Sequence, residues 1–272
     1  PLPAMALAQH DLPDLARAVR GVHTPTGLAS FEAGRRRLAL EPLLAIQAGL
    51  QTRRAGRAEG ARPVRLEKPV YAEIAARFPF AFTRGQKSVL ADIVRDMARR
   101  IPMRRLVQGD VGSGKTALAL YAAMAAVEAG GQVALMAPTE LLVEQHYYGA
   151  REMLQSVGIQ ADILTGSLPP AERRFLVERL KSGELQVVFG THALFSKDVS
   201  FQRLDLILID EQHRFGVGQR ASLAGKGLDA HLLLLTATPI PRTLALTLYG
   251  DLEVSTLKES PPGRGGIVTR WV

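Results

Sequence analysis

The chain has 272 residues, of which 47% are hydrophobic and 22% charged, an ordinary globular composition that can fill one large core or two modest ones. It contains no cysteine, which excludes disulfides and thiolate metal sites and fits the cytoplasm, where we expect the protein to act. The net charge is +8, and ten Lys/Arg against five Asp/Glu lie in residues 1–65, a balance that suggests an anionic partner without excluding a basic soluble protein that has none. The start of the sequence lacks a signal-peptide pattern, and the apolar stretch Ala117–Val127 is too short to span a bilayer, so we expect no membrane partner.

The N-terminal part of the sequence predicts a helical connecting segment over residues 1–62. Residues 1–29 contain several prolines and glycines and predict irregular chain with one short helix at Asp14–Arg20. From Ser30 onward a helix is predicted, because leucines recur at helical spacing and form one apolar face: Leu40, Leu43, Leu44 and Leu50. A charged stretch with glycine and proline ends this pattern, and we place a domain boundary near Pro63.

Residues 63–272 alternate between short apolar strands and helices. Strands are predicted at Leu106-Val107, Gln132–Ala137, Ala161–Leu164, Leu185–Gly190, Leu206–Asp210 and Leu232–Ala237, and helices at about Thr116–Ala129, Leu141–Ser156 and Pro170–Gly183. This alternation predicts an α/β domain with a mainly parallel sheet and helices on both faces. In such sheets ligands bind beyond the carboxyl ends of the strands, so we expect the functional site at that edge.

A glycine-rich loop, GDVGSGKT at residues 109–116, lies between a predicted strand and a predicted helix and matches G-x-x-x-x-G-K-[ST]. Glycines let the loop curl so that its N–H groups face phosphate oxygens, while Lys115 can reach the β- and γ-phosphates and the Thr116 hydroxyl can bind Mg²⁺. The positive end of the following helix adds to this. A chance glycine-rich turn is the alternative, but the flanking strand and helix favour phosphate binding by Gly109, Gly112, Ser113, Gly114, Lys115 and Thr116.

Two adjacent carboxylates, Asp210 and Glu211, follow the apolar run Leu206–Ile209. Mg²⁺ beside a triphosphate needs an oxygen ligand from a nearby strand end, and we predict that Asp210 supplies it together with Thr116. Glu211 would orient and deprotonate the attacking water. Without the glycine-rich loop, an acid-capped helix start would be the better interpretation; with both features present, nucleotide hydrolysis is favoured, with Lys115, Asp210 and Glu211 as catalytic residues.

Polar segments follow three other predicted strands: APTELLVEQH at 137–146, TGS at 165–167 and GTHALF at 190–195. Hydroxyls and N–H groups at helix starts suit phosphodiester contacts, although each segment alone is more often an ordinary N-cap. TATPIPRT at 236–243 also follows an apolar strand; alone it would be a turn, but this position favours an element that couples the nucleotide site to another part of the protein. Gln86 of FAFTRGQ has an amide that can pair with the adenine edge, a weak signal by itself. His146, His192 and His213 lack metal-site spacing, and we predict no zinc site.

In this order the motifs FAFTRGQ, GDVGSGKT, APTELLVEQH, TGS, GTHALF, DEQH and TATPIPRT resemble the first, RecA-like motor domain of superfamily-two helicases. More narrowly, RLVQGDVGSGKT, QVALMAPTELLVEQH, IDEQHRFGVGQR and LTATPIPRTLALTLYGDL are similar to the RecG family of bacterial ATP-dependent DNA helicases. The related Mfd translocases usually read DEEH, so Gln212 favours RecG. The helix with RRRLALEPLLAIQAGLQTRR resembles the segment that joins the RecG wedge domain to its motor. Phe82, where the family usually has leucine, departs from the pattern.

The resemblance implies an enzyme that uses ATP and Mg²⁺ to move on branched double-stranded DNA, such as forks, Holliday junctions, D-loops and R-loops, in recombination and repair. Carried over by motif, Gln86 would recognise adenine, and Gln212 and His213 would join the nucleotide site and link it to DNA movement. The expected DNA-contacting or coupling residues are Thr139, Thr165, Gly166, Thr191, His192, Thr236, Thr238 and Arg242.

The resemblance also implies parts beyond these 272 residues, namely a wedge domain and a second motor domain that carries an arginine finger. An arginine finger contributes about 10³–10⁵ in rate. We therefore expect residues 1–272 to be a monomeric fragment, ending just past Pro261–Gly266, that binds nucleotide and hydrolyses it poorly. The alternatives are an Mfd-type translocase that pushes RNA polymerase, a nucleotide-binding module in which Glu211 is only structural, and, with least support, a basic DNA-binding scaffold.

Overall fold

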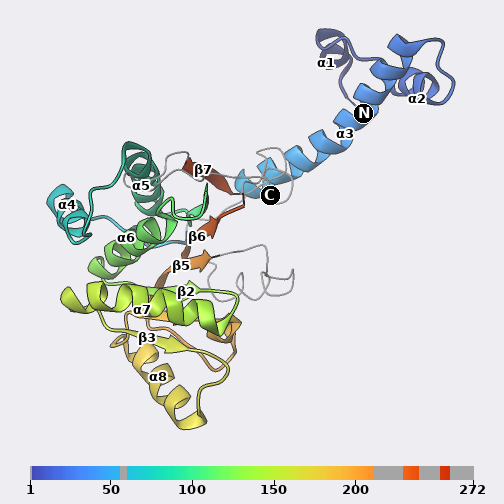
Figure 1. Cartoon of the computed structure of the whole chain (residues 1–272). Coiled ribbons are helices and arrows are strands. Elements are labelled where there is room, and N and C mark those ends of the chain that lie inside the picture. The colour runs from blue at the N-terminus through green and yellow to red at the C-terminus, as the bar shows by residue number, and fades with distance from the viewer. Residues whose placement is uncertain (1, 56–59, 211–228, 239–251, 258–272) are drawn as a thin grey trace, which may run out of the picture. The chain divides into compact units, whose positions relative to one another are not determined.

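A computed structural model of the chain describes residues 2–55, 60–210, 229–238 and 252–257 (Figure 1). The chain divides into two compact units. Among the described residues, the first unit contains residues 2–55, and the remainder forms a larger α/β unit. Of the helices described, none combines the length and the hydropathy that crossing a bilayer requires.

Three helices form the first unit: α1 (Ala4–Gln9), α2 (Leu15–His23) and α3 (Leu28–Ala55). The predicted short helix is confirmed as α2, which begins after Asp14, whose carboxylate accepts a hydrogen bond from the backbone N–H of Arg17 at 2.8 Å. The prediction of irregular chain elsewhere in residues 1–29 is wrong for α1. That helix has only six residues, too few to display a periodic apolar face.

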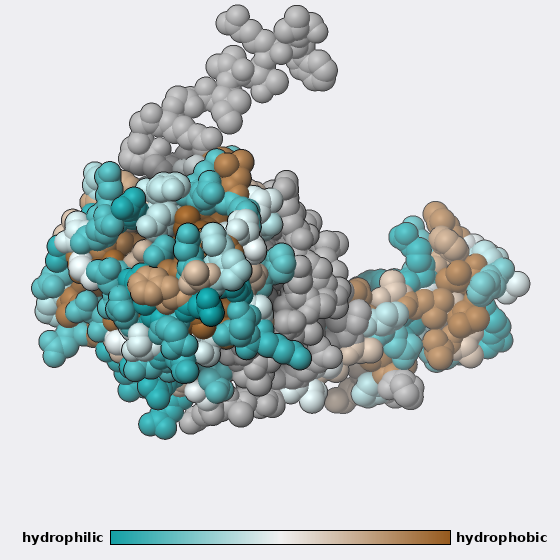
Figure 2. Space-filling view, turned by 90° about the horizontal axis from the view of Figure 1, so that it is seen from below, coloured by the Kyte–Doolittle hydropathy of each residue, from teal (hydrophilic) through white to brown (hydrophobic). Residues whose placement is uncertain are grey.

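Helices α2 and α3 cross closely at two glycines. A Cβ atom on Gly21 would lie 2.6 Å from the Ser30 carbonyl oxygen, and one on Gly34 would lie 2.5 Å from the Ala18 carbonyl oxygen. Outside this crossing the predicted apolar face of α3 is only partly covered, since Leu43 and Leu44 are 50% and 40% exposed. Figure 2 shows apolar side chains on the visible face of this unit, whose exposed large hydrophobic residues are Met5, Leu15, Val19, Leu28, Phe31, Leu43 and Leu44.

The α/β unit is built on a seven-stranded sheet in the order β3-β4-β2-β5-β6-β1-β7, and every strand pairing described is parallel. The parallel sheet predicted from the sequence is therefore confirmed. The strands are β1 (Arg104–Gly109), β2 (Gln132–Met136), β3 (Ala161–Leu164), β4 (Val187–Gly190), β5 (Leu204–Asp210), β6 (His231–Thr236) and β7 (Glu253–Leu257). Strand β7 was not predicted, because its sequence EVSTL has no apolar run; it pairs with β1 at the edge of the sheet.

Helices cover both faces of this sheet, as predicted. They are α4 (Lys68–Ala76), α5 (Arg84–Met97), α6 (Lys115–Glu128), α7 (Glu140–Ser156), α8 (Pro170–Ser182) and the 3₁₀ helix η1 (His192–Phe195). Buried residues of α5, α6 and α7 belong to one apolar cluster with the inward side chains of β2, β4, β5 and β6. Phe189 of β4 belongs to that cluster, whereas its neighbour Gly190 faces the opposite side, where Leu194 of η1 approaches it.

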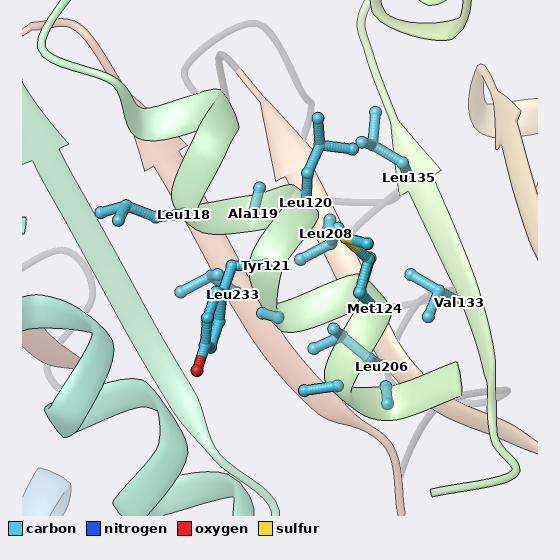
Figure 3. Packing of buried hydrophobic residues seen from close by; sticks show 14 of the residues in the cluster. Leu118, Ala119, Leu120, Tyr121, Met124, Val133, Leu135, Leu206, Leu208 and Leu233 are labelled. Atoms are coloured by element: carbon cyan, nitrogen blue, oxygen red, sulfur yellow. The ribbon is translucent and has the colours of Figure 1, made fainter. Parts of the chain in front are cut away.

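Helix α6 is the centre of the core. Its sequence is apolar around the whole circumference, which is typical of a helix that is buried on all sides. It packs on β2, β5 and β6 on one side and on α4 and α5 on the other. Figure 3 shows Met124 of α6 among Leu206 and Leu208 of β5 and Val133 of β2. Because α6 is enclosed in this way, the loop that leads into its N-terminus begins and ends on fixed elements.

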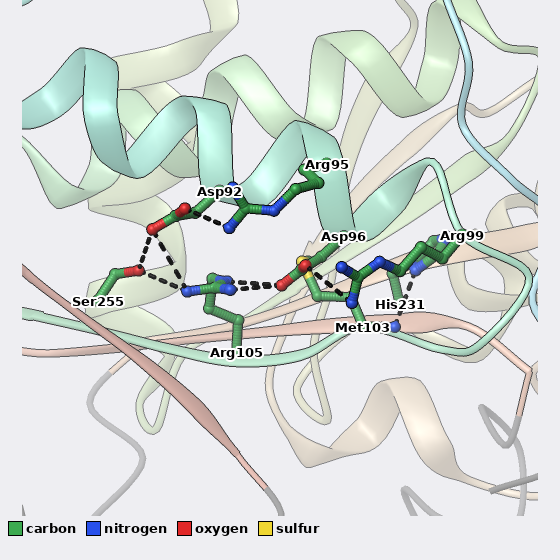
Figure 4. Close-up of polar contacts among 8 residues, drawn as sticks. All are labelled: Asp92, Arg95, Asp96, Arg99, Met103, Arg105, His231 and Ser255. Atoms are coloured by element: carbon green, nitrogen blue, oxygen red, sulfur yellow. Dashed lines mark hydrogen bonds and ion pairs between the residues drawn. The ribbon is translucent and has the colours of Figure 1, made fainter.

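A buried charged network joins α5, β1 and β7 (Figure 4). Arg105 of β1 is 5% exposed; its Nε donates to the Asp96 carboxylate of α5 at 2.9 Å, and its Nη1 donates to Ser255 Oγ of β7 at 2.6 Å. The Ser255 hydroxyl in turn donates to Asp92 of α5 at 3.3 Å. A buried guanidinium needs such partners, because an unpaired buried charge is costly. The network therefore fixes the edge strand β7 and helix α5 against the strand that precedes the glycine-rich loop.

Residues 60–64 are bonded to the α/β unit. The backbone N–H groups of Gly60 and Ala61 donate to the Arg100 carbonyl at 3.1 and 2.8 Å, and that of Val64 donates to the Met97 carbonyl at 2.8 Å. These contacts place residues 60–62 with the second unit. The domain boundary at residue 62 remains a prediction.

His231, the first residue of β6, is hydrogen-bonded to this segment. It is fully buried; its Nδ1 accepts from the Met103 backbone N–H at 3.0 Å, so the proton lies on Nε2, which donates to the Arg62 carbonyl at 3.1 Å. Burial lowers the pKa of His231 below 6.5 and outweighs the opposing effect of the hydrogen bond to Arg62. The folded chain therefore disfavours a second proton on this ring.

We expect this histidine to make folding stability depend on pH. Above about pH 6.5 the ring is neutral in both states and its bonds contribute fully; as the pH falls below that value the unfolded chain binds a proton that the folded chain does not, so stability is lost. In urea denaturation between about pH 7.5 and about pH 5.5, the unfolding midpoint should fall more for the wild type than for His231→Gln. The matched control is His23→Gln, at an exposed histidine of α2, in which the unfolding midpoint should change with pH as it does in the wild type. If the midpoint of His231→Gln also changes with pH as in the wild type, the assignment is contradicted.

Candidate nucleotide and nucleic-acid site

The glycine-rich loop joins the end of β1 to the start of α6, as predicted. Gly112 and Gly114 have φ angles of 76° and 90°, in the left-handed region that favours glycine. Gly114 is also the N-cap of α6, and no side chain caps this helix start. A Cβ atom at Gly114 would clash with Nε2 of Gln86. Glycine at this position is thus required both by the backbone angle and by the close approach of α5.

The Lys115 side chain folds back onto the glycine-rich loop that precedes it. Its Nζ donates to the carbonyl oxygens of Gly109 and Asp110 at 2.8 and 2.9 Å. Ser113 Oγ is buried and has no hydrogen-bond partner among the described residues. A curled loop, an uncapped helix N-terminus and a lysine within reach of the loop together form an arrangement that fits phosphate oxygens.

Gln86 is tied to this loop. It is 2% exposed; its Oε1 accepts from the Thr83 backbone N–H at 2.9 Å and its Nε2 donates to the Ser113 carbonyl at 2.9 Å. The Thr83 hydroxyl accepts from the Gln86 backbone N–H, which completes a capping box at the start of α5. Recognition of adenine by this amide would require it to give up these bonds, and that role remains a prediction.

Asp210, the predicted Mg²⁺ ligand, is the last residue of β5. The strand order places β6 alone between β5 and β1, and Asp210 pairs with Leu235 while Gln108 pairs with Thr236. Adjacent strands lie about 4.8 Å apart, so the Asp210 backbone and the start of the loop are separated by roughly 10 Å along the same sheet edge. The exposed Thr116 lies in the first turn of α6 and is available as a further oxygen donor. Glu211, the third predicted catalytic residue, lies outside the described residues, as do Gln212 and His213, which were predicted to join the nucleotide site.

His146 contacts Asp210, and the sequence reasoning missed this. Its Nε2 lies 2.8 Å from Asp210 Oδ2, with both side chains largely buried. The spacing along α7 could have indicated this contact. Thr139 caps the helix, and His146 follows seven residues later, two turns along the same helical face. A helix that begins at the carboxyl edge of a parallel sheet can therefore direct such a residue toward a neighbouring strand end.

The predicted coupling threonines form a turn at the end of β6. Thr236 Oγ1 lies 2.9 Å from Thr238 Oγ1 and accepts from the Thr238 backbone N–H at 3.2 Å. This turn lies on the strand between the glycine-rich loop and Asp210, so its position suits the coupling role, which stays a prediction. Arg242 lies outside the described residues.

The predicted nucleic-acid segments are brought to the same sheet edge, beyond β2, β3 and β4. The Thr139 hydroxyl caps α7 by accepting from the Leu142 backbone N–H at 3.3 Å. The Thr191 hydroxyl caps η1 by accepting from the Ala193 backbone N–H at 3.5 Å. Thr165 and Thr191 are buried, so their side chains shape the loops, whereas Thr139, Gly166 and His192 are exposed. A hollow of about 450 Å³ lies here, lined by Met136, Gly166, Arg173, His192, Ala193, Phe195 and Ser196.

Comparison with known proteins gives consistent matches. Residues 83–247 match the DEAD/DEAH box helicase family. The chain is 45% identical to the ATP-dependent DNA helicase RecG of Synechocystis sp. over 99% of this chain and 33% of that protein, and 44% identical to that of Streptococcus pneumoniae over 100% and 40%. It thus spans about a third to two-fifths of the length of these relatives.

Solved structures extend this comparison. RecG bound to a three-way DNA junction superposes with a TM-score of 0.83 at 40% identity, over 98% of this chain and 36% of that one. The Pyrococcus furiosus Hef helicase domain, at 22% identity and a TM-score of 0.51 over 69% of this chain and 41% of that one, shares the fold.

Proposed function

This chain belongs to the DEAD/DEAH box helicase family, and from that premise we propose that it is the ATP-driven first motor domain of a RecG-type DNA helicase. The resemblance to RecG that the motifs indicated is confirmed by the curated relatives and by the similar RecG structure. The observation that carries the proposal is the arrangement at the carboxyl edge: the glycine-rich loop after β1, Thr236 after β6 and Asp210 after β5 lie on three adjacent strands.

We assign the following roles at the nucleotide site. ATP and Mg²⁺, when bound, supply the reactive phosphoryl group and the charge that polarises it. Lys115 would exchange its bonds to the Gly109 and Asp110 carbonyls for bonds to phosphate oxygens, and the loop N–H groups would hold the same phosphates. Thr116 and Asp210 would hold Mg²⁺, with His146 orienting the Asp210 carboxylate from the side. Glu211 would take a proton from the attacking water.

We also propose that the protein acts on branched double-stranded DNA. The similar solved structure is of RecG bound to a three-way junction, and the exposed groups at Thr139, Gly166 and His192 suit contacts to a DNA backbone. Action as a monomer in the cytoplasm, with a wedge domain and a second motor domain supplied by the longer protein, is part of the same proposal. A motor that lacks the second domain's arginine finger should hydrolyse ATP about 10³–10⁵-fold more slowly.

Steady-state ATP hydrolysis tests this proposal. The full-length protein that contains this chain should be stimulated more by forked DNA than by linear duplex, and residues 1–272 alone should bind nucleotide with little turnover. Stimulation only by a stalled RNA polymerase complex would instead favour an Mfd-type translocase. Nucleotide binding without DNA-stimulated hydrolysis in the full-length protein would favour a non-catalytic nucleotide-binding module.

A further inference from the structure

One arginine of α8 joins the two loops that follow β3 and β4. Arg173 lies in the first turn of α8, and its Nη1 donates to the Thr165 carbonyl at 3.4 Å. Its Nη2 donates to the Ser196 hydroxyl at 2.6 Å and to the Ala193 carbonyl at 3.5 Å. One side chain thus spans a loop after β3 and a segment after β4 that are about thirty residues apart in sequence.

Two further contacts fix the guanidinium in this position. Its Nε donates to the Asp198 carboxylate at 2.9 Å, and the Ser196 hydroxyl donates to the Ala193 carbonyl at 2.7 Å. The hydrogen bond from Arg173 holds the pKa of Asp198 well below its ordinary range, which keeps this carboxylate charged. A planar guanidinium presents several donors in a rigid fork, and a lysine cannot reach the same set of acceptors.

The loop after β3 is held from its other side by α7. Glu140, in the first turn of α7, accepts from the Ser167 backbone N–H at 3.3 Å and from the Ser167 hydroxyl at 2.9 Å. The Ser167 hydroxyl also lies 3.0 Å from Thr165 Oγ1. The three segments that the sequence singles out for nucleic-acid contacts therefore form one bonded unit, with Glu140 joining the first to the second and Arg173 joining the second to the third.

A direct role of Arg173 as a phosphate ligand is disfavoured by its geometry. Its side chain is 21% exposed, and all three of its nitrogens already donate to protein acceptors. Asp198 also places a negative charge at 2.9 Å from Nε, which offsets the attraction for an anion. The exposed groups beside it are Gly166 and His192, which line the same hollow as Arg173.

We propose that Arg173 is a positioning residue that holds the loop Thr165–Ser167 and the segment His192–Ser196 in the relative arrangement that a DNA backbone binds. The DNA part of this inference rests on the proposed function. Arg173 acts through the two loops and does not itself touch DNA. Its loss should therefore weaken DNA binding without altering hydrolysis in the absence of DNA.

Three substitutions in the full-length protein test this. Arg173→Lys keeps the positive charge and loses the forked set of guanidinium donors, and Asp198→Asn removes the charged partner. Arg174→Lys is the matched control at the exposed neighbouring arginine. Hydrogen–deuterium exchange without DNA should become faster at residues 164–168 and 192–197 in Arg173→Lys, with α6 unchanged. The forked-DNA concentration for half-maximal ATPase stimulation should rise about tenfold in Arg173→Lys and rise less in Asp198→Asn, whereas Arg174→Lys should match the wild type.

The outcomes separate the alternatives. If Arg173→Lys keeps wild-type DNA stimulation while Asp198→Asn strengthens it, Arg173 binds phosphate directly and the inference is overturned. Exchange that rises equally in α6 and in the loops would show a general structural role and would also overturn it. If the wild type shows no DNA stimulation, the proposed function fails; faster exchange confined to the two loops would then still support the positioning role, and unchanged exchange would refute it.

Discussion

Replacing Lys115 with alanine is expected to lower ATP hydrolysis by the full-length protein about 10²–10³-fold. The lysine ammonium lies at the N-terminus of α6, within 2.9 Å of the carbonyls of Gly109 and Asp110, on the loop whose curvature fits phosphates. Its removal takes away a positive charge where negative charge is concentrated, together with two bonds that hold the loop closed. Steady-state hydrolysis and nucleotide binding by calorimetry measure the two effects.

The control for this substitution is Lys87→Ala, at an exposed lysine of α5. Both variants lose one positive charge, so a general electrostatic effect would lower both rates. We expect wild-type hydrolysis from Lys87→Ala, and cooperative thermal unfolding of both variants would show that both are folded. Equal losses in the two variants would remove Lys115 from its assigned role.

Replacing Asp210 with asparagine is expected to lower hydrolysis at least about 10²-fold and to raise the Mg²⁺ concentration needed for half-maximal rate. Asparagine keeps the shape of the side chain and an oxygen that can accept from His146, which lies 2.8 Å from the carboxylate. The change therefore removes mainly the negative charge. Rates measured across a Mg²⁺ titration report the effect on metal binding, and nucleotide affinity without Mg²⁺ should stay at the wild-type value.

Asp229→Asn provides the matched comparison, because this exposed aspartate lies just before the amino end of β6, whereas Asp210 lies at the carboxyl end of β5. It should leave both the rate and the Mg²⁺ requirement unchanged. A wild-type Mg²⁺ curve for Asp210→Asn, with a loss of less than about tenfold, would show that another group holds the metal.

Much of the α/β unit could be predicted from local pattern. The bounds of β3 agree with the prediction, α8 begins at Pro170 and ends before Gly183, and α6 ends before Gly130, because apolar runs and Gly/Pro signals act over a few residues. The glycine-rich loop was also predictable, since its function requires a fixed spacing along the chain. The roles of Glu211, Gln212, His213 and Arg242 remain predictions.

The sequence by itself determined six of the seven strands described and most of the helices, the loop that fits phosphate and the ends of the strands at which polar groups collect. Only the tertiary structure decided which distant groups meet there. Residues of β7 form a strand because β1 provides a partner strand. Gln86 bonds to a residue 27 positions away, His146 to one 64 positions away, and Arg173 to residues up to 25 positions away. Local periodicity reports which face of an element is apolar, whereas these contacts depend on strand order and on helix placement across the sheet, which no short stretch of sequence contains.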